Sequence, residues 1–127
     1  MKLKTSELTG RALDWAVGLA VTDDDVKCDG QHISVTFNGG RYIYSWNPTT
    51  NWEQCGQLIE RYTMDLTPVM GGTYCAGLSI TTGALCPDDY VNVEMYGATP
   101  QIAICRAVVA AQLGDEVEIP DELLEGE

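Results

Sequence analysis

Near the start of the chain, hydrophobic residues recur at the spacing of an amphipathic helix. The positions i, i+3, i+4 and i+7 are occupied by Leu13, Ala16, Val17 and Ala20. Because this spacing puts the four side chains on one face, it predicts a helix over residues 9–20. Thr9 is in place to cap the first turn, and Leu8 can pack back onto the apolar face.

A change to alternating polarity predicts a β-hairpin in the next segment. Residues 31–37 alternate apolar and polar side chains, as in a half-buried strand. The Asn-Gly-Gly sequence at 38–40 supplies residues that tolerate the positive φ of a tight turn. A return strand is then predicted over residues 41–46. Three aromatic side chains share one face of it: Tyr42, Tyr44 and Trp46.

The hairpin leads into a short helix through a proline-containing turn. Pro48 ends the strand because proline cannot donate a hydrogen bond to a neighbouring strand. One of residues 49–51 can cap a helix predicted over residues 52–61, and Glu53 follows Thr50 by three positions, as in a capping box. The residues expected on the core side of this helix are Trp52, Leu58 and Ile59, with Cys55 between them.

The second half of the chain predicts three more strands and a buried helix. The strands are expected at residues 63–66, 75–80 and 90–95, with a loop at 67–74 and a Gly-Pro-Asp turn region before the last strand. The helix has Thr99 as its cap and Pro100 at its first position, where a missing N–H costs nothing. Gly114 ends it. Its residues are apolar on most faces, so we expect it to be largely buried.

The predicted order of elements is α-β-β-α-β-β-β-α. Because hairpins dominate and no βαβ repeat is evident, we predict an α+β fold with helices packed on an antiparallel sheet, similar to an α-β-α sandwich. A chain of 127 residues is long enough for one domain with a modest core. We assign this domain to residues 1–114.

Acidic residues are concentrated at the C-terminal end. The chain carries a net charge of −12 with seven Lys and Arg residues, and seven of its 19 acids lie in residues 115–127. We interpret that segment as a solvated acidic tail, although Val117 and Ile119 alternate as in a docked strand. Direct binding to nucleic acid is disfavoured, because phosphate contacts need clustered Lys and Arg. An acidic surface could instead contact a basic protein.

The cysteines and apolar segments point to a reduced protein of the cytosol. Five widely spaced cysteines form no CxxC pair, and an odd number cannot all pair within one chain. With one histidine, His32, they do not predict a zinc site, and the aspartate run at 23–25 lacks the spacing of a calcium loop. The longest apolar run is too short to span a membrane, and no secretory signal is recognisable. We predict no metal and no cofactor.

No catalytic signature is present in the sequence. His32 lies on the polar face of a predicted strand, and neither a GxSxG motif nor a Cys–His signature occurs. The carboxylates follow no pattern that marks an acid and base pair. We therefore predict a protein that is not an enzyme.

Aromatic and arginine residues are the candidates for ligand binding. Arg106 lies in a nearly all-apolar helix, so it must pair with a carboxylate such as Asp14 or Glu60, or hold an anion in a cavity. The aromatic stripe is either sheet packing or a wall on which a planar ligand stacks. The predicted ligand-binding residues are Tyr44, Trp46, Thr50, Trp52, Arg61, Thr99 and Arg106.

Several motifs together resemble the NinX-like family of tailed phages. They are LTGRALDWAV at 8–17, YS..PTTNW at 44–52, LIE at 58–60, GATPQIAICR at 97–106 and LGDEVEIPDEL at 113–123. The resemblance implies an α-β-α sandwich domain with no established activity. It also marks the positions most important to the family: Trp15, Tyr44, Ser45, Pro48, Thr50, Trp52, Gly97, Thr99, Pro100 and Arg106. This chain inserts Trp46-Asn47 into the family's Tyr-Ser-Pro motif and has Asn51 where the family has aspartate.

Three functions remain in competition from the sequence. The first is a non-catalytic phage accessory protein that binds a small nucleotide-like ligand, such as a host immune signal, in counter-defence. The second is an acidic inhibitor or adaptor that binds a host or phage protein, and the third is a nucleotide-processing enzyme. A homo-oligomer would favour the first, because a small domain often builds a deep pocket only between subunits.

Overall fold

The computed structural model describes residues 1–22, 25–29, 32–37, 39–81 and 90–123. The helices within these residues are α1 (Gly10–Val21), α2 (Trp52–Tyr62) and α3 (Pro100–Leu113), with short 3-10 turns η1 (Thr5–Glu7) and η2 (Asp121–Leu123). The strands are β1 (Lys2–Lys4), β2 (Val26–Asp29), β3 (His32–Phe37), β4 (Tyr42–Ser45), β5 (Asp65–Val69), β6 (Thr73–Thr81), β7 (Tyr90–Gly97) and β8 (Glu116–Glu118).

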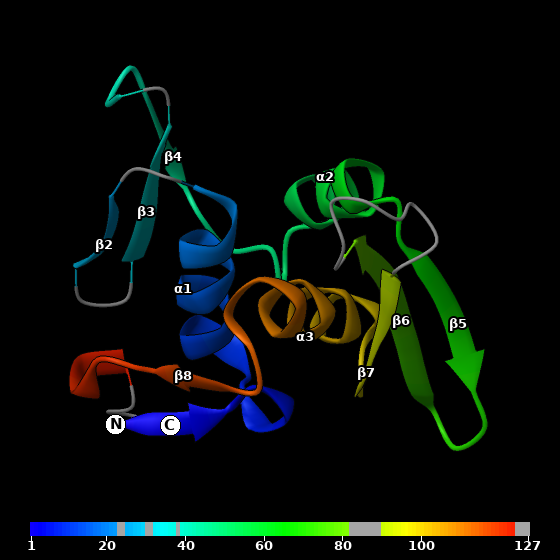
Figure 1. The fold of residues 1–127 in the computed structure, drawn as a ribbon. Coiled ribbons are helices and arrows are strands. Elements are labelled where there is room, and N and C mark those ends of the chain that lie inside the picture. Colours follow the sequence, from blue (N-terminus) through cyan, green and yellow to red (C-terminus); the bar gives the residue numbers. More distant parts are fainter. Residues whose placement is uncertain (23–24, 30–31, 38, 82–89, 124–127) are drawn as a thin grey trace.

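The fold is α+β, as predicted, with antiparallel pairing throughout the described strands. These strands divide into three sheets rather than one: β1-β8, β2-β3-β4 and β5-β6-β7. The two three-stranded sheets lie on opposite sides of α1 and α3 (Figure 1). The division leaves a corner between the β2-β3-β4 sheet and α2, and this corner is where the candidate site forms.

Helix α3 occupies the centre of the molecule, packed against β6, β7, α1 and α2 (Figure 1). Thr99 caps it as predicted, since its Oγ1 accepts a hydrogen bond of 3.2 Å from the Ile102 amide. The start of α3 approaches β7 closely at Gly97, where an added Cβ would lie 2.6 Å from the Ala103 backbone nitrogen. The fully buried residues of α3 are Ala103, Ile104, Cys105, Ala107, Val108 and Val109.

The segment predicted as an acidic tail packs, in large part, onto the domain. Strand β8 pairs with β1, so the beginning and the end of the described chain lie side by side (Figure 1). Val117, Ile119 and Leu123 are buried, whereas Glu118 and Asp121 between them are exposed. The alternation of Val117 and Ile119 thus produces the docked strand that their spacing indicated. Residues 124–127 lie outside the described structure.

Two strands had no clear signal in the sequence. β1 is only three residues long and alternates lysines with Leu3, which packs on the core. β2 adds a third strand beside β3, with Val26 paired to Val35. Each of these strands forms by pairing with another strand of the chain, so the local sequence pattern alone did not predict it.

The loop predicted at residues 67–74 is wrong, because β5 and β6 form a hairpin there. Its turn uses Gly71 and Gly72, whose φ values are 90° and 77°. Pro68 lies within β5, and the strand tolerates it because β5 is at the edge of its sheet, where an N–H on the open side needs no partner. The predicted Gly-Pro-Asp turn falls in residues 82–89, outside the described residues.

No helix among the described residues is long and apolar enough to cross a membrane.

Candidate functional site

The corner between β4 and α2 is held by the side chain of Gln54. Its Oε1 accepts a hydrogen bond of 2.8 Å from the Asn47 amide, and its Nε2 donates one of 2.6 Å to the Ser45 carbonyl. The Gln54 amide in turn donates to Oδ1 of Asn51, which is the true N-cap of α2. The predicted capping box of Thr50 and Glu53 is therefore wrong, because Asn51 and Gln54 occupy the equivalent positions one residue later.

A buried carboxylate anchors the same turn to α1. Asp14 is 5% exposed, and its two oxygens accept hydrogen bonds from the amide and the hydroxyl of Thr49, at 2.9 and 3.1 Å. Burial raises the pKa of the Asp14 carboxyl to about 6, against the lowering effect of the two Thr49 hydrogen bonds. The turn is thus fixed from both sides, by Gln54 on α2 and by Asp14 on α1.

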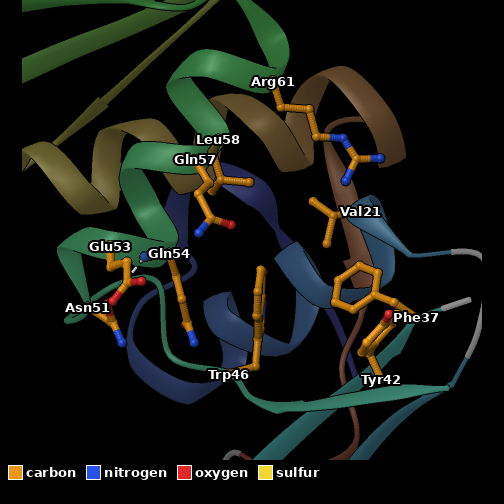
Figure 2. A pocket seen from close by; sticks show the side chains of 10 residues that line it. All are labelled: Val21, Phe37, Tyr42, Trp46, Asn51, Glu53, Gln54, Gln57, Leu58 and Arg61. Atoms are coloured by element: carbon orange, nitrogen blue, oxygen red, sulfur yellow. Dashed lines mark hydrogen bonds between the residues drawn. The ribbon is translucent and has the colours of Figure 1, made fainter. Parts of the chain in front are cut away.

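A cleft of about 600 Å³ opens between this corner and the β3-β4 hairpin (Figure 2). Its volume is within the range of small-molecule sites. The lining combines an aromatic side, an apolar floor and a row of polar residues from α2. These residues are Val21, Phe37, Tyr42, Trp46, Asn51, Glu53, Gln54, Gln57, Leu58 and Arg61.

The aromatic side of the cleft is centred on Trp46. Its ring meets Phe37 edge to face, with centroids 6.2 Å apart and planes at 62°. Trp46 is 8% exposed, and its buried Nε1 has no hydrogen-bond partner among the described residues. An unpaired buried donor costs about 1–3 kcal/mol. The packing of the Trp46 ring must therefore outweigh this cost to keep the ring in place. Tyr42 extends the aromatic side toward solvent (Figure 2).

One face of α2 forms the opposite side of the cleft. Positions 53, 54, 57 and 61 recur at helical spacing, so their side chains follow one another along the cleft (Figure 2). Glu53 and Arg61 lie at its two ends, and eight residues of helix separate them by roughly 12 Å along the axis. Arg61 has no ion pair with a described residue, although its guanidinium carbon lies 5.3 Å from the Tyr62 ring centroid.

The structure brings together two of the seven predicted site residues, Trp46 and Arg61. Trp52 was expected in the core but is 51% exposed, since it begins α2 and the core contact comes from the later turns. Thr50 is exposed, Thr99 caps α3, and neither lines the cleft. The side chain of Tyr44 lies outside the described part of the structure.

Arg106 also lies apart from the cleft lining and has a structural role. Its Nε donates to the Leu8 carbonyl at 3.0 Å, and its NH1 donates to the Tyr96 carbonyl at 2.8 Å. The predicted salt bridge to Asp14 or Glu60 is wrong, because Asp14 is occupied by Thr49 and backbone carbonyls satisfy the guanidinium. Burial lowers the pKa of Arg106 from its usual value. The side chain ties the start of α1 and the end of β7 to α3.

Sequence reasoning missed most of the lining, in particular Phe37 and Gln57. A signal was present on α2, where the polar residues 53, 54, 57 and 61 recur at helical spacing. No signal in the sequence could show that the hairpin would face this side of α2, because the two belong to separate elements of the tertiary structure.

The described cysteines and acidic residues do not assemble a metal site. No group of three or more His, Cys, Asp and Glu side chains in the described ranges could hold an ion. Cys55, Cys75 and Cys105 are free thiols. A hydrogen bond to Cys55, together with burial, raises the pKa of the Cys105 thiol well above its usual value, so this thiol stays protonated at neutral pH.

The family model for NinX of bacteriophage P22 matches residues 4–112. The chain belongs to the NinX family of phage proteins. The resemblance of the motifs at 8–17, 44–52 and 97–106 is thereby confirmed, and the match covers α1, the cleft and all but the last residue of α3. A search among curated proteins finds no match. Two motif positions of NinX, Thr99 and Arg106, have structural contacts in this fold, so their presence in the motif is explained without a ligand.

Proposed function

We propose that this NinX protein is a non-catalytic phage accessory protein that binds a small nucleotide-type ligand in the cleft and sequesters it in the host cytosol, as a counter to host signalling. The observation that carries the proposal is the composition of the cleft: an aromatic side faces an arginine that has no ion pair with a described residue. Aromatic faces stack on any nucleobase, and a guanidinium binds phosphate through two parallel hydrogen bonds.

The remaining lining supports a planar polar ligand rather than a purely apolar one. Gln57 presents an amide that can donate and accept, and Gln54 is already committed to the backbone of the corner. The floor at Val21 and Leu58 is apolar and buried, so it favours the flat face of a ring system. A rigid corner held by Asp14 and Gln54 reduces the ordering cost of binding.

The test is a thermal-shift screen of purified protein against nucleosides, cyclic nucleotides and ADP-ribose-type compounds. A ligand present at 100 times its Kd adds about 2.7 kcal/mol of stability, which corresponds to a rise in Tm of roughly 8–10 °C for a domain of this size. Binding should also change Trp46 fluorescence. The ligand should be recovered intact after heat denaturation, as expected of sequestration without turnover. Chemical conversion of the ligand would favour the enzyme hypothesis instead.

Two variants and one control localise the binding. Arg61→Gln and Gln57→Ala should lower the affinity by about tenfold or more, since each removes a contact to a desolvated polar group. Lys4→Gln removes the same unit of charge from β1, outside the cleft lining, and should leave the affinity unchanged. The proposal is wrong if no compound in the screen shifts Tm, or if Lys4→Gln weakens binding as much as Arg61→Gln.

The acidic-adaptor alternative needs a test other than deletion of the tail. Removing residues 115–127 would expose the core around Val117, Ile119 and Leu123 and so confound any loss of binding. Neutralising the exposed Glu116 and Glu118 instead leaves these apolar anchors in place. A partner that binds the acidic surface should then bind more weakly, and salt should weaken it further.

A further inference from the structure

The charges that line the cleft are few and balanced. Arg61 is the single cationic side chain among the described lining residues, and Glu53 is the single carboxylate. The chain as a whole carries a net charge of −12. A highly anionic ligand would therefore meet one favourable charge in the cleft and a repulsive field around it.

The two charges are also separated along the cleft. Glu53 is in the first turn of α2 and Arg61 in the last, roughly 12 Å apart along the helix axis. A guanidinium can satisfy one phosphate group through two parallel hydrogen bonds, but a second and third phosphate would need further cations. The Glu53 end instead accepts hydrogen bonds, so it favours the amino or hydroxyl groups of a ligand.

The space between the two charges is suited to a neutral ring. It is bounded by Trp46, Phe37 and Leu58 (Figure 2). Gln57 adds an uncharged amide to this part of the lining.

Building on the proposed function, we infer that the cleft selects nucleotides that carry a single anionic group, of the cyclic nucleoside monophosphate type, and rejects nucleoside di- and triphosphates. The phosphate binds Arg61, the base stacks beside Trp46, and sugar or base donors face Glu53. Each added phosphate brings negative charge that no described lining residue compensates. Discrimination against di- and triphosphates then comes from electrostatic repulsion of the added phosphates as much as from favourable contacts with the preferred ligand.

The experiment is calorimetric titration with a charge series on one base, repeated on a second base. The series runs from nucleoside through cyclic monophosphate and monophosphate to di- and triphosphate, for adenine and for guanine, in EDTA to exclude metal-bridged binding. We expect the affinity to be highest for the cyclic monophosphate. It should fall by roughly three- to tenfold with each further phosphate at low ionic strength.

Two variants separate this inference from the proposed function. Glu53→Gln should improve triphosphate binding relative to the cyclic monophosphate by about three- to tenfold, because it removes the only carboxylate among the described lining residues. Arg61→Gln should reduce binding of the cyclic monophosphate to the level of the nucleoside. Lys4→Gln is again the control, since Lys4 lies on β1, outside the cleft lining.

The outcomes are distinct. If a triphosphate binds as tightly as the cyclic monophosphate, or if Glu53→Gln leaves the ranking unchanged, the single-charge inference is overturned while the nucleotide-binding proposal stands. If no member of either series binds, the nucleotide-binding proposal itself fails, and this inference fails with it. If Lys4→Gln weakens binding as strongly as Arg61→Gln, the assignment of the phosphate to Arg61 is wrong.

Discussion

The buried carboxyl of Asp14 makes a prediction about the pH dependence of stability. Its pKa is raised from 3.8 to about 6 in the folded protein, chiefly by burial. The folded state therefore holds this proton more tightly than the unfolded state does. The stabilisation is fully present below pH 3.8 and is lost as the pH rises through 6. At 1.36 kcal/mol per pKa unit, the complete loss amounts to roughly 3 kcal/mol.

The substitution Asp14→Asn removes the titration and keeps the shape. The amide Oδ1 can still accept from the Thr49 backbone N–H, and the amide nitrogen can donate to the Thr49 hydroxyl. We therefore expect a variant whose stability lacks this pH-dependent term. At neutral pH it should be more stable than the parent protein by up to about 3 kcal/mol, because no charge has to be desolvated.

Urea unfolding followed by tryptophan fluorescence measures the effect. The isoelectric point of ≈ 4.2 makes the protein prone to precipitate near pH 4, so the practical range is pH 5–8. About half of the stabilisation from Asp14 is lost within this pH range. The difference in unfolding free energy between Asp14→Asn and the parent should therefore grow by roughly 1.4 kcal/mol from pH 5 to pH 8. Glu60→Gln is the control, because that side chain is exposed.

The result that would refute the reasoning is a difference between Asp14→Asn and the parent that stays constant with pH. The Asp14 carboxyl would then titrate at its ordinary value, and burial would not raise its pKa. A pH-dependent difference of the same size for Glu60→Gln would show that general acidity, and not the Asp14 site, produces the effect.

Three further predictions concern the packing of the domain. Gly97→Ala should destabilise the fold by about 1–3 kcal/mol, because its Cβ would collide with the α3 backbone. Gly56→Ala, in open space on α2, should instead stabilise the fold by up to about 1 kcal/mol. Thermal unfolding of the two variants measures both effects. Thr99→Ala should lower the free energy of unfolding by about 1 kcal/mol, because it removes the cap of α3. Thr9→Ala should lower it by less, because Thr9 makes no side-chain cap hydrogen bond. Equal losses for the two variants in urea unfolding would contradict this. Ile119→Ala should cost about 2–5 kcal/mol, and a negligible loss in calorimetry would mean that the acidic segment does not dock.

The sequence determined the helices and their ends closely. Helical periodicity, Pro100 and Gly114 predicted α3 within one residue, because caps and apolar spacing are local properties. Alternation likewise located β3 and indicated that Ile119 would dock near the end of the chain. The family followed from motifs distributed over the whole chain, and the match at residues 4–112 confirms it.

Only the tertiary structure decided which polar groups are structural and which line a cavity. Arg106 was the strongest candidate from composition, since a charge in an apolar helix needs a partner, yet backbone carbonyls of Leu8 and Tyr96 supply that partner. Asp14 had no marked pattern in the sequence, and burial in the folded protein raises the pKa of its carboxyl to about 6. Burial and hydrogen bonding depend on which distant segments of the chain come into contact. Local residue spacing does not determine these tertiary contacts.

The segment from Tyr44 to Glu60 shows both contributions. Its sequence predicted a strand, a turn and a helix, and these elements form as expected. The hairpin and α2 become two sides of one cleft only because separate anchors hold the turn, Asp14 from α1 and Gln54 from α2. The sequence thus supplied the aromatic and cationic side chains, and the tertiary structure decided that Trp46 and Arg61 share a cavity while Trp52 and Arg106 do not line it.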